Sequence, residues 1–186
     1  MFDDADLMRR ELEHLIAEQA QDVLLVMPSY GGIVGTQAAV GLGKVERQAG
    51  YDQRGERGGV VCLLYVCAFI WQKASICENG ICVPMNPERI FYQDLPVDDQ
   101  TKWATHIKPQ PLAYQFNPMT KAAYENIPVT YLHCKNDQAL PLHIQKFFVE
   151  RCIAKVETFT CAAGHSPFLS QPDNFVKIVV KISGPA

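Results

Sequence analysis

One stretch decides the fold: V-L-L-V-M-P-S-Y-G-G-I-V-G, residues Val23 to Gly35. An apolar run typical of a buried strand ends at Ser29, and Gly31 and Gly32 follow where a helix can begin. A strand, a sharp turn and a helix in this order raise the serine above the carboxyl end of a sheet, in the arrangement called a nucleophile elbow. The first turn of such a helix directs backbone N–H groups toward negative charge beside the serine.

Length and composition limit the class of protein. With 186 residues, of which 48% are hydrophobic and 20% charged, the chain fits a single globular domain over residues 1–186 with a sizeable core. The net charge of -3 and the dispersed Lys and Arg residues offer no basic stripe, so we expect no nucleic-acid partner. The start M-F-D-D-A-D lacks an apolar signal core, and the longest apolar run, residues 60–71, is too short to span a bilayer. These features predict a cytoplasmic protein with no membrane partner.

Seven cysteines without a secretion signal are typical of reduced core residues. Cys62, Cys67 and Cys134 lie in apolar strands and are interpreted as small hydrophobes. Cys77 and Cys82 flank an Asn-Gly pair that favours a two-residue hairpin, which would place them opposite each other. A disulfide there is sterically feasible, although the expected compartment favours thiols. No second Cys or His pair stands at ligand spacing, so we predict no metal site.

Apolar periodicity predicts strands and helices in alternation. We expect strands at residues 23–27, 60–70, 129–134 and 156–161, and helices near residues 7–16, 31–49, 141–152 and 172–182. This alternation is typical of a mostly parallel α/β sheet with flanking helices and right-handed crossovers. Residues 72–128 are rich in proline and show little periodicity, which predicts an excursion over the sheet. Its aromatic residues are available to line a pocket: Phe91, Tyr92, Trp103, Tyr114 and Phe116.

Three residues with complementary chemistry follow three of the predicted strands. Ser29 follows strand 23–27, Asp137 follows strand 129–134, and His165 follows strand 156–161. The carboxyl ends of parallel strands share one edge of the sheet, where α/β active sites assemble. In this order, His165 would take the serine proton, and Asp137 would fix the imidazole tautomer and stabilise its positive charge. The sequence therefore predicts a Ser-Asp-His catalytic triad.

Each member of the triad also has a structural alternative. Ser29 could cap the following helix, Asp137 could serve only an Asx turn, and His165 could cap the turn before Pro167. Asp94 is the reserve candidate for the acid. The remaining histidines have no comparable context and are interpreted as surface or core residues: His14, His106, His133 and His143.

Five segments carry a resemblance to a known family: V-M-P-S-Y-G-G, G-G-V-V-C-L-L-Y-V-C-A-F, F-Y-Q-D-L-P, I-P-V-T-Y-L-H-C-K-N-D-Q-A-L-P and A-G-H-S-P-F-L-S-Q-P. From near Leu7 to the end, the chain resembles the α/β-hydrolase superfamily, in particular fungal esterase-like members related to the plant esterase and hydroxynitrile lyase branch. The resemblance implies that Ser29 is the nucleophile, Asp137 the acid and His165 the base. It also implies that the Tyr30 N–H is one oxyanion donor, that residues 72–128 form the cap, and that no cofactor is needed.

The chain departs from the family pattern at three places. Met27 replaces the first glycine of G-x-S-x-G, and Pro28 stands where the relatives commonly have histidine. Family members begin with further strands before the segment that matches Leu7, and those strands carry the second oxyanion donor. By the resemblance we therefore expect an N-terminally truncated version of the fold. The strand 23–27 would then form a bare edge that invites self-association with a second chain.

Three functions follow as hypotheses. The first is a serine hydrolase that cleaves a carboxylic ester of a small hydrophobic substrate through an acyl-Ser29 intermediate; the resemblance to fungal members suggests a role in secondary metabolism. The second is a hydroxynitrile-lyase-type enzyme with the same triad. That branch usually has a cap lysine, which the sequence does not single out among Lys73, Lys102, Lys108 and Lys121. The third is a catalytically impaired hydrolase with a non-catalytic or interaction role.

Overall fold

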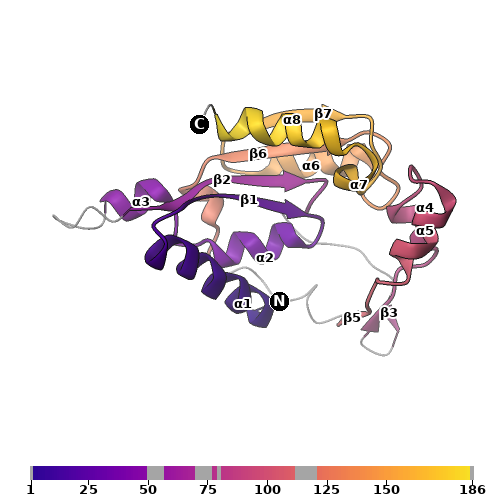
Figure 1. The fold of residues 1–186 in the computed structure, drawn as a ribbon, viewed down its shortest axis with the longest axis horizontal. Coiled ribbons are helices and arrows are strands. Elements are labelled where there is room, and N and C mark those ends of the chain that lie inside the picture. The colour runs from indigo at the N-terminus through magenta and orange to yellow at the C-terminus, as the bar shows by residue number, and fades with distance from the viewer. Residues whose placement is uncertain (1, 50–56, 70–76, 79–80, 112–120, 185–186) are drawn as a thin grey trace.

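Four parallel strands form the centre of the computed structural model, which describes residues 2–49, 57–69, 77–78, 81–111 and 121–184. The strands lie side by side in the order β1 (Asp22–Pro28), β2 (Gly59–Val66), β6 (Val129–Cys134) and β7 (Val156–Cys161). Every neighbouring pair is parallel, so all four carboxyl ends reach the same edge of the sheet (Figure 1). The predicted parallel α/β sheet is confirmed.

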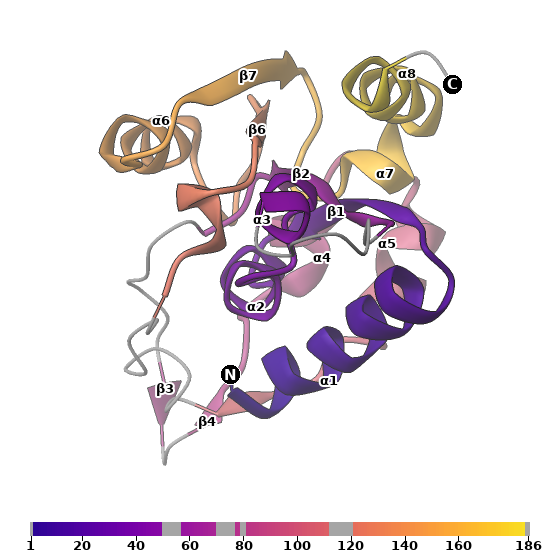
Figure 2. The same ribbon diagram turned by 90° about the vertical axis from the view of Figure 1, so that its left-hand side faces the viewer.

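Helices cover both faces of this sheet. One face packs against α1 (Phe2–Glu13), which continues into a π-helical turn (His14–Glu18), and against α2 (Gly31–Ala38) and α6 (Leu142–Arg151). The other face packs against α8 (Pro172–Ser183), which follows the short helix α7 (Pro167–Ser170). Figure 2 shows the sheet between these two layers.

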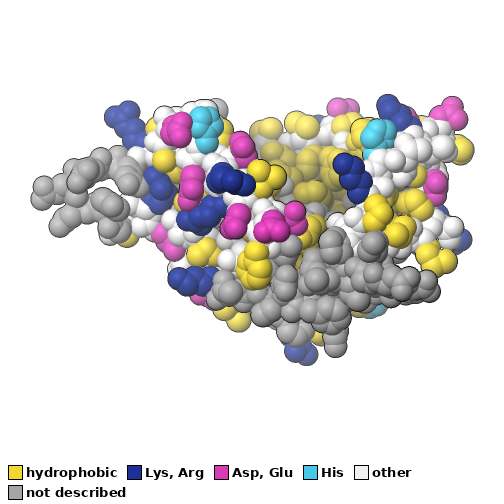
Figure 3. All heavy atoms as spheres, turned by 90° about the horizontal axis from the view of Figure 1, so that it is seen from below, with side chains coloured by type: hydrophobic (Ala, Val, Ile, Leu, Met, Phe, Trp, Pro, Cys, Tyr) yellow, Lys and Arg dark blue, Asp and Glu magenta, His cyan; other side chains and the backbone are white. Residues whose placement is uncertain are grey.

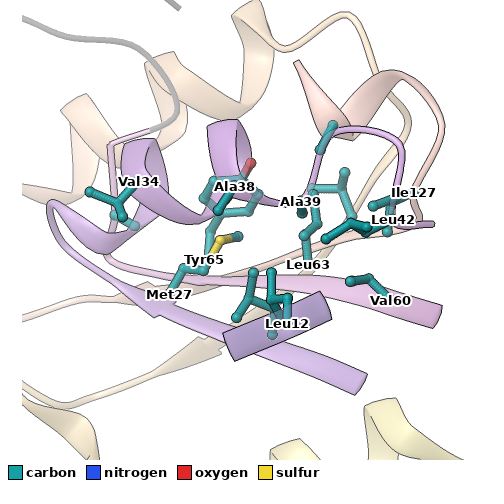
Figure 4. Packing of buried hydrophobic residues seen from close by; sticks show 14 of the residues in the cluster. Leu12, Met27, Val34, Ala38, Ala39, Leu42, Val60, Leu63, Tyr65 and Ile127 are labelled. Carbon is teal, nitrogen blue, oxygen red and sulfur yellow. The ribbon is translucent and has the colours of Figure 1, made fainter. Parts of the chain in front are cut away.

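The core follows from alternation along the strands, because successive side chains point to opposite faces. Leu63 and Tyr65 of β2 pack with Met27 into the cluster beneath α1 and α2, whereas Leu64 and Val66 pack toward α8. Figure 4 shows the first cluster between these helices and the sheet. All four of these β2 side chains are fully buried, which is why the β2 sequence is almost continuously apolar.

Two predicted boundaries are wrong. The helix expected over residues 31–49 ends at Ala38, and a separate helix, α3 (Lys44–Ala49), follows. The turn between them contains Gly41 at a φ of 73°, a left-handed conformation that glycine adopts without strain. The strand expected over residues 60–70 ends at Val66, because Cys67 has a φ of 36° and turns the chain out of the sheet.

Two helices from the segment between β2 and β6, α4 and α5, lie beyond the carboxyl ends of the strands (Figure 1). The described elements are β3 (Cys77–Glu78), β4 (Ile81–Cys82), α4 (Pro87–Phe91), α5 (Val97–Ala104), β5 (Gln110–Pro111) and a 3-10 turn (Ala123–Glu125). Cys77 pairs with Cys82 in antiparallel register, which confirms the predicted hairpin. Their side chains, and the predicted pocket residues Tyr114 and Phe116, lie outside the described part of the chain.

The strand β1 lies at one edge of the sheet. Among the described residues it pairs with β2 alone, and its Val26 side chain is 37% exposed. Self-association through this edge stays a prediction. Within the described ranges, the helices are all too short or too polar to cross a bilayer.

Candidate active site

Ser29 occupies a strained turn between β1 and α2. Its φ is 49°, in the left-handed region that a serine rarely adopts. The Ser29 N–H donates to the Val66 carbonyl at 3.2 Å, and the Ser29 carbonyl accepts from the N–H groups of Gly32 and Phe69, each at 3.1 Å. This turn is therefore fixed from three sides. A Cβ added at Gly32 would lie 2.4 Å from the Phe69 carbonyl oxygen, so the close approach of the helix to the chain after β2 requires glycine there.

Tyr30 begins the elbow helix. It is the N-cap of α2, so its backbone lies at the positive end of that helix and directly after Ser29. Its hydroxyl donates to Asp4 Oδ2 at 2.8 Å, which ties the turn to α1. Its role as an oxyanion donor stays a prediction.

His165 and Asp137 form a buried hydrogen-bonded pair. His165 Nδ1 lies 2.8 Å from Asp137 Oδ2, and the two residues are only 7% and 4% exposed. The other carboxylate oxygen, Oδ1, accepts from the N–H groups of Ala139 at 2.8 Å and Leu140 at 2.9 Å. Three donors thus face one carboxylate, which holds its plane toward the imidazole. This geometry places the Nδ1 proton of a neutral His165 on the Asp137 side and leaves Nε2 as the acceptor.

The loops that carry these two residues are joined along their backbones. The Lys135 N–H donates to the Cys161 carbonyl at 3.0 Å, and the Asn136 N–H donates to the Ala163 carbonyl at 3.1 Å. The Asn136 side chain donates to the Ala162 carbonyl at 2.9 Å. These bonds continue the pairing of β6 with β7 past the ends of both strands, so the two loops form one rigid unit.

Asp94 has a role that the sequence did not predict. It was the reserve candidate for the acid, but its Oδ2 accepts from the Gly164 N–H at 2.6 Å, whereas Asp137 holds the imidazole. The neighbouring Gln93 Nε2 donates to the Asn136 carbonyl at 2.7 Å. The segment between α4 and α5 therefore contacts both loops. The sequence indicated this contact only through the segment F-Y-Q-D-L-P, which was one of the five segments that carry the family resemblance.

Of the predicted pocket aromatics, Phe91 reaches the pair. The centroid of its ring lies 5.1 Å from that of His165, and it contacts Tyr92 on its other side at 6.1 Å. Figure 3 shows a hollow lined by apolar side chains between the part of the molecule built from α1 and the part built from α4 and α5. Apolar surroundings strengthen electrostatic interactions at a nearby site, because they lower the local dielectric.

The pair and the neighbouring Cys67 bring together side chains of types that can bind a metal ion. One potential ligand atom from each of Cys67, Asp137 and His165 lies within 4.8 Å of the other two. His165 and Asp137 already share a hydrogen bond, and the Cys67 thiol donates to the His165 carbonyl at 3.2 Å. Burial raises the pKa of the Cys67 thiol, so the thiolate that metals prefer is disfavoured. The donor set suits proton transfer better than metal binding.

The structure therefore gathers the predicted residues at one edge of the sheet. His165 and Asp137 are in direct contact. Ser29 is hydrogen-bonded to Val66 and Phe69 at the end of β2, and Cys67, which lies between these two residues in the chain, donates to the His165 carbonyl. The described contacts include no direct hydrogen bond between Ser29 and His165. The sequence missed Cys67, because a cysteine after an apolar strand carries no turn signal. The remaining histidines lie as expected, one in the core and three at the surface: His133, and His14, His106 and His143.

Comparisons with known proteins agree with this architecture. The model of the alpha/beta hydrolase family matches residues 2–178. The alpha/beta hydrolase nvfD of Aspergillus novofumigatus is 28% identical over 204 residues, which cover 99% of this chain and 78% of that protein. The solved structure of polyneuridine aldehyde esterase matches with a TM-score of 0.66 and 19% identity, over 95% of this chain and 78% of that one. A methylesterase protein, MES16 from Arabidopsis, matches with a TM-score of 0.66 and 19% identity, over 96% of this chain and 77% of that one. The chain belongs to the alpha/beta hydrolase family.

Proposed function

We propose that this protein is a serine hydrolase that cleaves carboxylic esters of small hydrophobic molecules through an acyl-Ser29 intermediate. One observation carries the proposal: a buried His165–Asp137 pair lies at the same sheet edge as a serine held at a φ of 49°. A helix cap needs no left-handed serine, and an Asx turn needs no buried histidine. Strain of this kind is typical of functional sites, where the surrounding structure maintains it.

The first half of the proposed reaction acylates the serine. His165 Nε2 accepts the Ser29 hydroxyl proton while Oγ bonds to the ester carbonyl carbon. The π electrons of the carbonyl move to its oxygen, and the Tyr30 N–H at the start of α2 is one donor to the resulting oxyanion. When this intermediate collapses, the bond to the alcohol oxygen breaks, and His165 returns the proton to the leaving alkoxide.

The second half releases the acid. A water molecule replaces the alcohol, His165 removes its proton, and the hydroxide oxygen bonds to the acyl carbon. Collapse of the second tetrahedral intermediate expels Ser29 Oγ, which regains a proton from His165. The Nδ1 proton stays on His165 throughout and is donated in a hydrogen bond to Asp137, whose carboxylate stabilises the imidazolium that forms in each half.

The substrate class rests on two further observations. The hollow beside the cap has an apolar lining, which favours a ligand with little charge (Figure 3). The two structures compared above are named as an esterase and a methylesterase. We place this ester cleavage in fungal secondary metabolism by resemblance to fungal relatives alone.

A series of p-nitrophenyl esters tests this function. Acetate to octanoate esters are incubated with the protein, with Ser29→Ala and with Asp98→Asn, a matched surface variant on α5. We expect turnover by the natural chain and by Asp98→Asn, a rate that rises with acyl length, and no turnover above background by Ser29→Ala. Equal rates for all three proteins would contradict the proposal.

The same samples separate the alternative functions. Cleavage of a cyanohydrin without ester turnover would support the hydroxynitrile-lyase-type reaction, in which the triad only moves protons. A folded protein that acts on neither substrate class would support the non-catalytic role.

A further inference from the structure

We propose that Asp94 is a positioning residue for His165, and that together with Gln93 it forms a clamp, here called the cap clamp, that locks the catalytic loops from the side of the cap. The inference rests on the proposed function, because it concerns the geometry of the same histidine. It adds a residue outside the three expected triad positions and outside the oxyanion donor.

Asp94 is in direct contact with the loop that carries His165. Asp94 Oδ2 lies 2.6 Å from the N–H of Gly164, the residue directly before His165. A carboxylate that accepts from a backbone N–H forms a charge-assisted hydrogen bond, which is shorter and stronger than a neutral one. Holding the N–H of Gly164 restrains the residue before His165, and so restrains the backbone from which the imidazole extends.

Gln93 makes a matching contact with the loop that carries Asp137. Gln93 Nε2 donates to the Asn136 carbonyl at 2.7 Å, and Asn136 directly precedes Asp137. Two consecutive residues, Gln93 and Asp94, thus each bind a backbone group of the residue that precedes one member of the pair. Because both loops are held by neighbouring residues of one segment, these contacts restrict the distance between the His165 imidazole and the Asp137 carboxylate.

Gln93 and Asp94 pack closely against Gly164. A Cβ at this position would lie 2.4 Å from Gln93 Nε2 and 2.8 Å from Asp94 Oδ1. Glycine is therefore required for the clamp to reach the loop, and Gly164 itself is buried. Phe91 adds an apolar contact from the same segment, since its ring centroid lies 5.1 Å from that of His165.

The clamp matters for function because it restrains the His165 loop from the side of α4, where the described contacts also include the Phe91 ring. Catalytic geometry is sensitive to small displacements, and a shift of about 1 Å can cost on the order of a hundredfold in rate. Loss of the Asp94 bond should therefore slow the chemistry of Ser29 more than it weakens the fold, because Asp94 is exposed.

Three variants test the cap clamp. Asp94→Ala removes the acceptor, and Asp94→Asn keeps an oxygen in nearly the same place. Gln100→Ala is the matched control, because it removes the 2.7 Å bond from Gln100 Nε2 to the Leu95 carbonyl in the same segment without touching either loop. Should Asp94→Ala fail to fold, Asp94→Glu, which displaces the carboxylate by one methylene group, replaces it.

Two readouts are measured on each variant: the second-order rate of fluorophosphonate reaction with Ser29, and the low-field proton NMR signal of the His165 Nδ1 hydrogen bond. We expect Asp94→Ala to react about tenfold to a hundredfold more slowly and to shift or broaden the NMR signal. Asp94→Asn and Gln100→Ala should stay within about threefold of the natural rate, since each preserves the Gly164 bond.

The outcomes are distinguishable from failure of the proposed function. If Asp94→Ala reacts as fast as Gln100→Ala and its NMR signal is unchanged, the proposed role of Asp94 is wrong, whereas the proposed hydrolase function is unaffected. If the natural chain does not react with the probe at all, the proposed function fails, and the NMR signal alone decides whether Asp94 positions His165.

Discussion

Replacement of Asp137 separates its contribution to stability from its contribution to catalysis. The carboxylate accepts three hydrogen bonds, one from His165 on Oδ2 and two from the Ala139 and Leu140 N–H groups on Oδ1. Asp137→Ala removes all three, whereas Asp137→Asn keeps an oxygen for the two backbone donors and replaces the acceptor of the imidazole Nδ1–H with an amide N–H. Hydrogen bonds to a charged group contribute about 1.5 kcal/mol or more each, so we expect losses of about 4.5 kcal/mol for alanine and about 1.5 kcal/mol for asparagine.

Activity should not follow stability in these variants. An asparagine presents an N–H to His165 Nδ1, which favours the wrong tautomer, and the corresponding exchange in serine proteases lowers kcat by about 10⁴. We expect a similar fall in the fluorophosphonate reaction rate for Asp137→Asn and Asp137→Ala. Urea unfolding followed by tryptophan fluorescence gives the stability, and the labelling rate gives the activity.

The design of this experiment allows two refutations. Labelling of Asp137→Asn within tenfold of the natural rate would show that Asp137 does not orient His165. An unfolding free energy for Asp137→Ala that equals that of Asp137→Asn would show that the Ala139 and Leu140 bonds contribute nothing. Asp98→Asn on the exposed face of α5 serves as the control for the general effect of removing one negative charge.

Four further predictions follow from the same structure. Ser29→Gly should be more stable than Ser29→Ala by roughly 0.5–1 kcal/mol in urea unfolding, because the left-handed backbone costs alanine about 1–2 kcal/mol and this exceeds the extra chain entropy of glycine; equal stabilities would contradict the strained turn. Gly32→Ala should lose about 1–3 kcal/mol through its contact with a backbone carbonyl, whereas Gly31→Ala, whose Cβ meets only Pro28 at 3.5 Å, should lose nothing by the same assay. The Cys67 thiol should resist a disulfide reagent in the folded protein and react after unfolding, since burial raises its pKa; fast labelling of folded protein would refute this. Burial lowers the pKa of His133, so the unfolded state binds the proton first and stability falls as pH drops below about 6.5; His133→Gln should flatten this slope in unfolding measured from pH 7.5 to 5.5, and an unchanged slope would contradict it.

The sheet and its order along the chain could be predicted because each strand is a local pattern. Strands 129–134 and 156–161 are bounded by turn residues, and the structure places β6 and β7 at those residues. The parallel arrangement then follows from the alternation with helices. The same logic placed Asp137 and His165 at one edge, since parallel strands end together.

Two features were missed for different physical reasons. The bond from Gly164 to Asp94 joins residues 70 positions apart, and nothing local distinguishes an aspartate that holds an amide from one that holds an imidazole. The elbow helix stops at Ala38 through the conformation of Gly41, in a run whose apolar spacing continued the helical pattern. Tertiary packing thus decided the role of Asp94, whereas the left-handed backbone of Gly41 decided the end of the helix, and the sequence left the local alternatives nearly equal in both cases.

The most direct test of the central claim is to find where a fluorophosphonate probe binds covalently. The purified, folded protein is labelled beside Ser29→Ala and His165→Ala, and the modified peptide is identified by mass spectrometry. We predict one adduct, on Ser29, that both substitutions abolish. A folded protein that takes up no probe, or an adduct that persists in Ser29→Ala, would contradict the claim that this serine is the nucleophile.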